Sequence, residues 1–245
     1  DYTEIKDRLL DLGAADLFDA ETRILEENIY GVDLNGEAVE IARLSIWIKT
    51  AKKGRKLSNL DATIVQGNSI VTDPTVDPRA MDWSRFQAVQ AAGGFDVVLG
   101  NPPYIRHELF KEIKPHLEAE YAVWHGMADL YVYFFELGLR RLKPGGRIGY
   151  IVANKWLRAG YGEPLRRFLA DQAVVEEITD FGHAKQIFPD ADTFPVIALV
   201  RRPVDGVAAP AVIRGCRIKR EELRVADLPA QIAAAVTALP ASAQT

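Results

Sequence analysis

The stretch Phe95-Asp96-Val97-Val98-Leu99-Gly100-Asn101-Pro102-Pro103-Tyr104 joins an apolar run to an abrupt stop. Its first five residues predict a strand, and Gly100 and the two prolines end it, because proline cannot donate to a strand ladder. In open α/β sheets, ligands bind beyond the carboxyl ends of the strands. Asn101 to Tyr104 therefore stand where such a fold places its site.

Strands and helices alternate outward from this stretch in both directions. Further strands are predicted at 29–32, 62–65, 147–152, 174–181 and 194–200, and helices at 37–48, 129–142 and 164–171. In the first helix the apolar residues 38, 41, 42, 44, 45 and 48 recur at helical spacing and predict its packed face. The breakers at 143–146 (Lys-Pro-Gly-Gly) are expected to form a turn that ends the second helix. This alternation predicts a doubly wound, mainly parallel α/β sheet. After Pro203 the composition shifts toward alanine and proline. We therefore expect a catalytic domain over 1–204, and a linker or the start of a recognition domain over 205–245.

The composition limits the possible classes of protein. A chain of 245 residues that is 48% hydrophobic can bury one good core. Cys216 is its one cysteine, which excludes an internal disulfide framework and fits a reducing cytoplasm. The sequence contains no run of about 18 apolar residues, so no membrane span is predicted. The net charge of −4 counts against an autonomous DNA-binding protein, because phosphate contacts need lysine and arginine.

Asn101 to Tyr104 offer hydrogen-bond acceptors and an aromatic ring. The prolines carry carbonyl acceptors without amide donors, and Asn101 adds a side-chain carbonyl. Such acceptors suit a group with two N–H donors, such as the amino group of adenine, whose lone pair is delocalised into the ring. Bonds to Asn101 Oδ1 and the Pro102 carbonyl would localise that lone pair, and Tyr104 could stack on an extruded base. The alternative is a rigid turn that merely ends a strand.

The stretch 95–104 resembles the catalytic motif of DNA adenine-N6 methyltransferases. More closely, the chain is similar to the methyltransferase part of large type IIG restriction–modification and phage-exclusion (BREX-type) enzymes. Three further segments carry the resemblance, which covers about residues 20–202: 29–33 with 38–45, 128–131 with 142–146, and 186–189. It implies a Rossmann-like fold that binds S-adenosylmethionine. It also implies a cytoplasmic, site-specific DNA (adenine-N6) methyltransferase (EC 2.1.1.72) of a restriction–modification or phage-defence system.

The resemblance assigns three residues to the cofactor. Asp33 would accept hydrogen bonds from the ribose hydroxyls, which suits a carboxylate because it only accepts; otherwise it is a solvated helix cap. Asn68 stands where the family usually carries an aspartate that contacts the cofactor's adenine amino group, and its amide oxygen can still accept. Phe134 matches an aromatic residue that packs on the cofactor's adenine, although a phenylalanine on a helix face is often a core residue.

The resemblance also predicts how the substrate is held. Phe188, which precedes Pro189, would stack on the adenine flipped out of double-stranded DNA, on the side opposite Tyr104. The histidines show no metal-ligand spacing, and methyl transfer from a sulfonium needs no metal. Five basic residues after the catalytic motif could contact phosphate or form an ordinary solvated face: Arg106, His107, Lys111, Lys114 and His116.

The sequence departs from the family at its start. The glycine-rich loop that cradles the methionine part of the cofactor is absent before Asp33, and with it the first strand of the sheet. A gap in the middle of a sheet would leave unpaired edges on both neighbouring strands. Residues 1–204 are therefore expected to be a partial methyltransferase domain, inactive in isolation.

Two other classes of function fit the same motif. One comprises methyltransferases that act on a glutamine of translation release factors or on guanine N2 of ribosomal RNA. The long segments 74–94 and 104–127 argue against these compact enzymes. The other is a non-catalytic methyltransferase-like scaffold, which the missing glycine loop favours and the intact catalytic motif opposes. The oligomeric state is left open.

Overall fold

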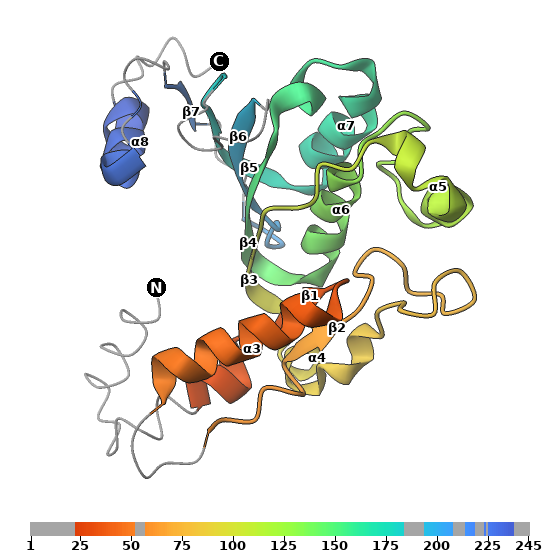
Figure 1. The fold of residues 1–245 in the computed structure, drawn as a ribbon. Coiled ribbons are helices and arrows are strands. Elements are labelled where there is room, and N and C mark those ends of the chain that lie inside the picture. The colour runs from red at the N-terminus through yellow and green to blue at the C-terminus, as the bar shows by residue number, and fades with distance from the viewer. Residues whose placement is uncertain are drawn as a thin grey trace. The chain divides into compact units, whose positions relative to one another are not determined.

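The computed structural model describes residues 23–51, 57–183, 194–207, 214–218, 223 and 225–237. The chain divides into two compact units, unit 1 over Asp1–Ala91 and unit 2 over Ala92–Thr245 (Figure 1). Each unit has its own sheet: two strands in unit 1 and five strands in unit 2.

Unit 1 is built around a short parallel pair of strands. Its elements in chain order are the π-helical turn η1 (Ile24–Asn28), β1 (Gly31–Asp33), α3 (Gly36–Thr50), β2 (Ile64–Gln66), the 3-10 turn η2 (Trp83–Arg85) and α4 (Gln87–Ala91). β1 pairs with β2 from Gly31↔Ile64 to Asp33↔Gln66. Asn35 caps the start of α3, because its side chain accepts a hydrogen bond from the Glu37 amide over 2.8 Å.

Helix α3 packs on this strand pair with a face that differs from the predicted one. Val39, with Leu25, Leu60 and Ile64, forms the core of unit 1, and Ala42, Ile46 and Trp47 pack against this core. Ile41, Leu44 and Ile48, which belonged to the predicted apolar face, are at least half exposed. The helix carries apolar residues on two sides, so periodicity alone could not tell which side packs on the strands.

Unit 2 contains the larger sheet, with the strand order β3-β4-β6-β5-β7. The strands are β3 (Phe95–Gly100), β4 (Leu142–Ala153), β5 (Val174–Asp180), β6 (Pro195–Arg201) and β7 (Arg214–Arg217). The β3–β4 and β5–β7 pairs are parallel, whereas β6 is antiparallel to both β4 and β5. The predicted strands are therefore present, and β6 is the one that runs against the others.

The first half of β4 corrects a prediction. Residues 143–146 (Lys-Pro-Gly-Gly) were expected to form a turn, with the strand beginning at Arg147. The strand instead begins at Leu142, which pairs with Phe95, and the register shifts before Val97 pairs with Arg147. Gly145 has a positive φ of 82° within this irregular stretch. The breakers thus produce a bulge rather than a break.

Helices α6 (Tyr131–Arg141) and α7 (Glu163–Gln172) lie on one side of this sheet in Figure 1. α6 is almost wholly buried, and its tyrosines Tyr131 and Tyr133 are inaccessible to solvent. Beyond the predicted domain edge, β7 joins the sheet and α8 (Leu228–Thr237) packs beside it. Cys216 and Leu223 share a small core cluster with Phe181 there. The boundary near residue 205 stays a prediction.

Among the described residues, four strands have a single hydrogen-bonded neighbour. They are β1 and β2 of the two-stranded sheet, and β3 and β7 at the two ends of the five-stranded sheet. On β3 the side chains of Val97 and Leu99 are 54% and 76% exposed.

Candidate active site

Asp33 lies at the carboxyl end of β1 in unit 1. Its side chain is exposed, and one carboxylate oxygen, Oδ1, accepts a hydrogen bond from the Asn35 amide over 2.7 Å. Within the described residues, Oδ2 has no hydrogen-bond partner. The carboxylate is therefore oriented by its own turn while one oxygen stays open to a ligand.

Asn68 follows β2, and its amide is oriented by a carboxylate. The Asn68 Nδ2 donates to Asp77 Oδ2 over 2.9 Å. Asp77 in turn accepts from the Arg79 amide over 2.8 Å and from the Arg79 guanidinium over 3.1 Å. These bonds, led by the one from the Arg79 side chain, lower the pKa of Asp77 to about 2. Because an ionised carboxylate can only accept, the amide nitrogen faces Asp77 and Asn68 Oδ1 is left as the open acceptor.

Asp33 and Asn68 meet at the same edge of the strand pair. Asp33 pairs with Gln66 in the ladder, and the Gly67 amide donates to the Asp33 carbonyl over 2.8 Å. Asn68 is the next residue, and its backbone forms an isolated bridge with Ala80. Unit 1 thus presents one free carboxylate oxygen and one free amide oxygen side by side, which suits a ribose diol and an amino group.

The catalytic motif lies in unit 2, directly after β3. Gly100 pairs with Tyr150 of β4, and a Cβ on Gly100 would lie 3.2 Å from the Tyr150 ring. Glycine therefore lets the tyrosine ring pass close to the strand end. Asn101 and Pro103 are exposed and Pro102 is buried. In the described part of the chain, neither the Asn101 amide nor the Pro102 carbonyl has a hydrogen-bond partner.

Tyr104 is held at both its hydroxyl and its ring. The hydroxyl donates to the Ile151 carbonyl over 3.3 Å, and the ring meets Tyr131 edge to face at 6.1 Å between centroids. Burial raises the pKa of Tyr104 to about 12. The next residue is also tied down, since the Ile105 carbonyl accepts from the Leu130 amide over 2.9 Å. A half-buried, neutral ring in a fixed orientation is a platform suited to stacking.

Phe134 is more exposed than its neighbours on helix α6. Its neighbours Tyr133 and Phe135 are inaccessible, whereas Phe134 is partly exposed. Its carbonyl accepts from the hydroxyl of Tyr150 over 3.3 Å, so the tyrosine beside Gly100 also touches the Phe134 backbone. Tyr150 therefore contacts both the Phe134 backbone and the strand end that carries the catalytic motif.

Phe188 lies outside the described residues, and its role stays a prediction. The residues that flank its segment are described. The backbone amide of Asn154, which follows β4, donates to the Phe194 carbonyl over 2.8 Å. The rings of His183 and Phe194 stack with their centroids 5.1 Å apart. His183 and Phe194 therefore lie near the carboxyl end of β4. The catalytic motif follows the carboxyl end of β3, the parallel neighbour of β4.

The sequence analysis missed Asp77 and Arg79. Their spacing of two residues is unremarkable in an insert that was noted only for its length, and their role emerges once the backbone brings Asp77 to Asn68. In the described part of the chain, no three histidine, cysteine, aspartate or glutamate side chains gather where a metal ion could be held. None of the described helices combines the length and the apolar character that a membrane crossing requires.

Comparison with solved structures identifies the class of fold. A class I S-adenosylmethionine-dependent methyltransferase from Listeria monocytogenes superposes with a TM-score of 0.57 at 15% identity, over 91% of this chain and 61% of that one. The DrdV–DNA complex superposes with a TM-score of 0.61 at 17% identity, over 89% and 24%. The fold is that of the S-adenosylmethionine-dependent methyltransferases, as predicted.

Comparison of sequences identifies the family. Residues 27–188 match the family of the Eco57I restriction-modification methylase, and the chain belongs to it. It is 34% identical to the type II methyltransferase M.XhoI of Xanthomonas vasicola over 110 residues, which are 44% of this chain and 20% of that protein. It is 25% identical to the restriction enzyme and methyltransferase RM.Eco57I of Escherichia coli over 207 residues, 76% and 20% respectively. The chain thus spans about a fifth of each relative's length.

Proposed function

We propose that this chain is the catalytic part of a restriction–modification enzyme that transfers a methyl group from S-adenosylmethionine to N6 of adenine in DNA. One observation carries the proposal. The Asn101 side chain and the Pro102 carbonyl stand together at the end of β3 as acceptors with no partner in the described residues. Acceptors left open at a strand end suit an incoming amino group with two donors.

The residues of the motif activate the amine. Its two N–H groups donate to Asn101 Oδ1 and the Pro102 carbonyl, which favours a tetrahedral nitrogen and localises the lone pair. That nitrogen would form its new bond to the cofactor's methyl carbon as the carbon–sulfur bond breaks, with S-adenosylhomocysteine as the leaving group, and would release its proton to water. Acceptors that are already in place act on charge as it develops, without a cost of reorganisation in the transition state.

The residues of unit 1 fit the nucleoside half of the cofactor. Asp33 Oδ2 would accept from the ribose hydroxyls, and Asn68 Oδ1, oriented by Asp77, would accept from the adenine amino group. Phe134 lies in unit 2 and is partly exposed, and its packing on that adenine stays a prediction from the resemblance. S-adenosylmethionine supplies a methyl group made electrophilic by its sulfonium.

DNA is the substrate favoured by the family and by the stacking platform. The chain's relatives carry restriction–modification names, and the solved neighbour DrdV is a complex with DNA. Tyr104 would stack on the extruded adenine, with Phe188 on its other face, an arrangement worth about 1–3 kcal/mol per stacked base. The extruded base would come from double-stranded DNA.

The test is a methyl-transfer assay with the labelled cofactor. Unmodified plasmid DNA is incubated with the whole enzyme of which this chain is the proposed catalytic part, digested to nucleosides and analysed by mass spectrometry, with Asn101→Ala as the inactive control. N6-methyl-2′-deoxyadenosine that is present in the wild-type digest and absent from the Asn101→Ala digest supports the proposal. Methylation of a release factor or of ribosomal RNA instead of DNA would favour the glutamine or guanine enzymes. Cofactor binding without transfer to any of these substrates would favour a scaffold.

A further inference from the structure

Four exposed cations follow β3 and β4, the strand that carries the catalytic motif and its parallel neighbour. They are Arg106 and Lys111, which follow β3, and Lys155 and Arg158, which follow β4. None of the four side chains forms a hydrogen bond or an ion pair with the described residues. We propose that these four residues form a phosphate-binding surface for the DNA strand that carries the target base. The inference rests on the proposed function and extends it from the base to the backbone.

The topology brings the two pairs together. β3 and β4 are adjacent and parallel, so the segments after them leave the sheet at one edge. The bond from the Tyr104 hydroxyl to the Ile151 carbonyl ties the motif to the end of β4, just before the 3-10 turn η5 (Asn154–Leu157). Arg106 lies two residues after Tyr104, and Lys155 lies within that turn.

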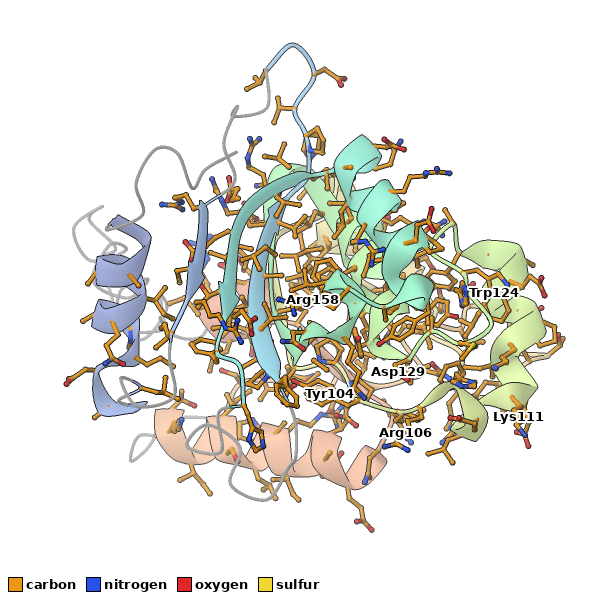
Figure 2. All side chains as sticks on the ribbon, turned by 90° about the horizontal axis from the view of Figure 1, so that it is seen from above. Tyr104, Arg106, Lys111, Trp124, Asp129 and Arg158 are labelled. Carbon is orange, nitrogen blue, oxygen red and sulfur yellow. The ribbon has the colours of Figure 1, made fainter. Side chains whose placement is uncertain are left out.

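Asp129 shows that the two segments share one electrostatic environment. Burial raises the pKa of its carboxyl, and the charges that oppose the rise are those of Lys155, His107 and Arg106, in that order. Cations from both segments therefore face the same carboxylate. Figure 2, viewed from above the fold, shows Arg106 and Asp129 near Tyr104, with Lys111 farther along the same loop.

Two other basic groups of this loop, Lys114 and His107, already have structural roles. The Lys114 ammonium donates to the Gly126 carbonyl over 2.7 Å and lies 3.5 Å from His107 Nδ1. His107 Nε2 lies 3.1 Å from the carboxylate of Glu108. The cations of the loop thus divide into those that hold the loop and those that remain open to solvent and to phosphate.

The local charge also explains how an acidic chain could grip DNA at this place. The chain as a whole has a net charge of −4, so its general surface repels the backbone. Attraction is expected only where unpaired cations outnumber nearby carboxylates. Each phosphate neutralised by such a cation releases a condensed counterion, which makes binding strongly dependent on salt.

The test compares salt dependences of DNA binding. Binding of the protein to a fluorescent DNA duplex of arbitrary sequence is measured across about 50–200 mM KCl, with each of the four cations changed to alanine singly and together. Each phosphate contact contributes about 0.9 to the slope of log K against log salt. The fourfold variant should therefore flatten the slope by about 3–4 and lose affinity at low salt.

Two controls separate charge from structure. Leu109→Ala alters the same loop at a residue that is 77% exposed and uncharged, and should leave the slope unchanged. Arg167→Ala removes an exposed cation from α7. Arg167 lines a groove together with Pro144 and Arg202, which lie near the amino end of β4, away from the catalytic motif. This variant should leave the slope unchanged as well.

The outcomes distinguish this inference from the function on which it rests. In the methyl-transfer assay, the fourfold variant should raise the KM for DNA, and this rise should grow with salt, because the four residues bind the DNA backbone. A wild type that methylates DNA while the fourfold variant keeps its salt slope overturns the phosphate surface alone. A slope that falls equally in the Arg167→Ala control also overturns it. A wild type that methylates no DNA overturns the proposed function, and this inference with it.

Discussion

The amide nitrogen of Asn68 donates to Oδ2 of Asp77 over 2.9 Å, which leaves Asn68 Oδ1 as the open acceptor. If the side-chain amide of Asn68 could flip, Nδ2 would take the place of Oδ1 half of the time and would present a donor to the adenine amino group that the cofactor is proposed to place there. The ionised Asp77 removes this ambiguity, and the Arg79 guanidinium keeps Asp77 ionised. An asparagine held in this way can do the work of the aspartate that the family usually carries.

Asp77→Asn should weaken the binding of S-adenosylmethionine by about 3- to 10-fold, because the new amide can donate or accept and no longer fixes Asn68. The loss corresponds to about one hydrogen bond. Titration calorimetry measures it. Asp82→Asn, which removes a carboxylate that binds only its neighbour Ser84, is the matched control. Equal affinities of wild type and Asp77→Asn would remove Asp77 from the site.

Asp77 should also make the stability of the protein sensitive to acid. Its pKa falls from the usual 3.8 to about 2 in the folded chain, so its ionised form stabilises the fold above pH 3.8. That contribution is lost as the pH falls toward 2. Urea unfolding of wild type and Asp77→Asn should show a constant difference near neutral pH that shrinks between about pH 4 and 2. A difference that grows on acidification would contradict this assignment.

Asp33→Ala should weaken cofactor binding by about 1.5–3 kcal/mol, the usual cost of losing hydrogen bonds to a charged group. This corresponds to roughly 10- to 100-fold in the dissociation constant. Asp61→Ala is the control, since Asp61 is an exposed carboxylate of the same unit that pairs with Arg43. If both variants bind the cofactor equally well, Asp33 does not hold the ribose.

Asn101→Ala should abolish methyl transfer while cofactor affinity stays within a few-fold of wild type. The lost acceptor acts on the amine and not on the cofactor, so the effect belongs to kcat. Asn101→Asp keeps acceptor oxygens at the same position and should recover part of the rate. A severe loss of cofactor binding in Asn101→Ala would place this residue in the wrong role.

Tyr104→Phe and Tyr104→Ala should separate the ring from the hydroxyl. Phenylalanine keeps the stacking face and loses only the bond to the Ile151 carbonyl, so the rate should fall by less than about 10-fold. Alanine also removes the stack, worth about 1–3 kcal/mol per base. The signal of 2-aminopurine placed at the target base reports extrusion, and it should drop for alanine only. Equal signals in both variants would argue against stacking.

Much of the fold could be predicted from the sequence. Each strand that was expected from an apolar run is present, although β3 leaves Val97 and Leu99 exposed. The predicted start of β4 was wrong. Lys143 to Gly146 have the sequence of a turn, but pairing with β3 makes them a bulge within the strand. The packed face of α3 was also wrong, because the helix is apolar on two sides. In both places tertiary contacts decided what local pattern could not.

The site was predictable to the extent that it follows strand ends. Asp33 and Asn68 share one edge because their strands are parallel neighbours, and Asn101 follows β3 as expected. Asp77 could not be found, because nine residues of irregular chain separate it from the amide that it orients. Sequence motifs likewise could not show which loop cations hydrogen-bond within the loop, as Lys114 does, and which stay exposed, as Arg106 does.

The central position of β6 has a consequence for folding during synthesis. β6 hydrogen-bonds to both β4 and β5, yet it is made after them, and β7, the other neighbour of β5, is made later still. The pair β3 and β4 can form early, but β5 has no partner until residues 195–201 have left the ribosome. A nascent chain that pauses before this point would hold a long-lived unpaired strand, which is a target for chaperones and proteases.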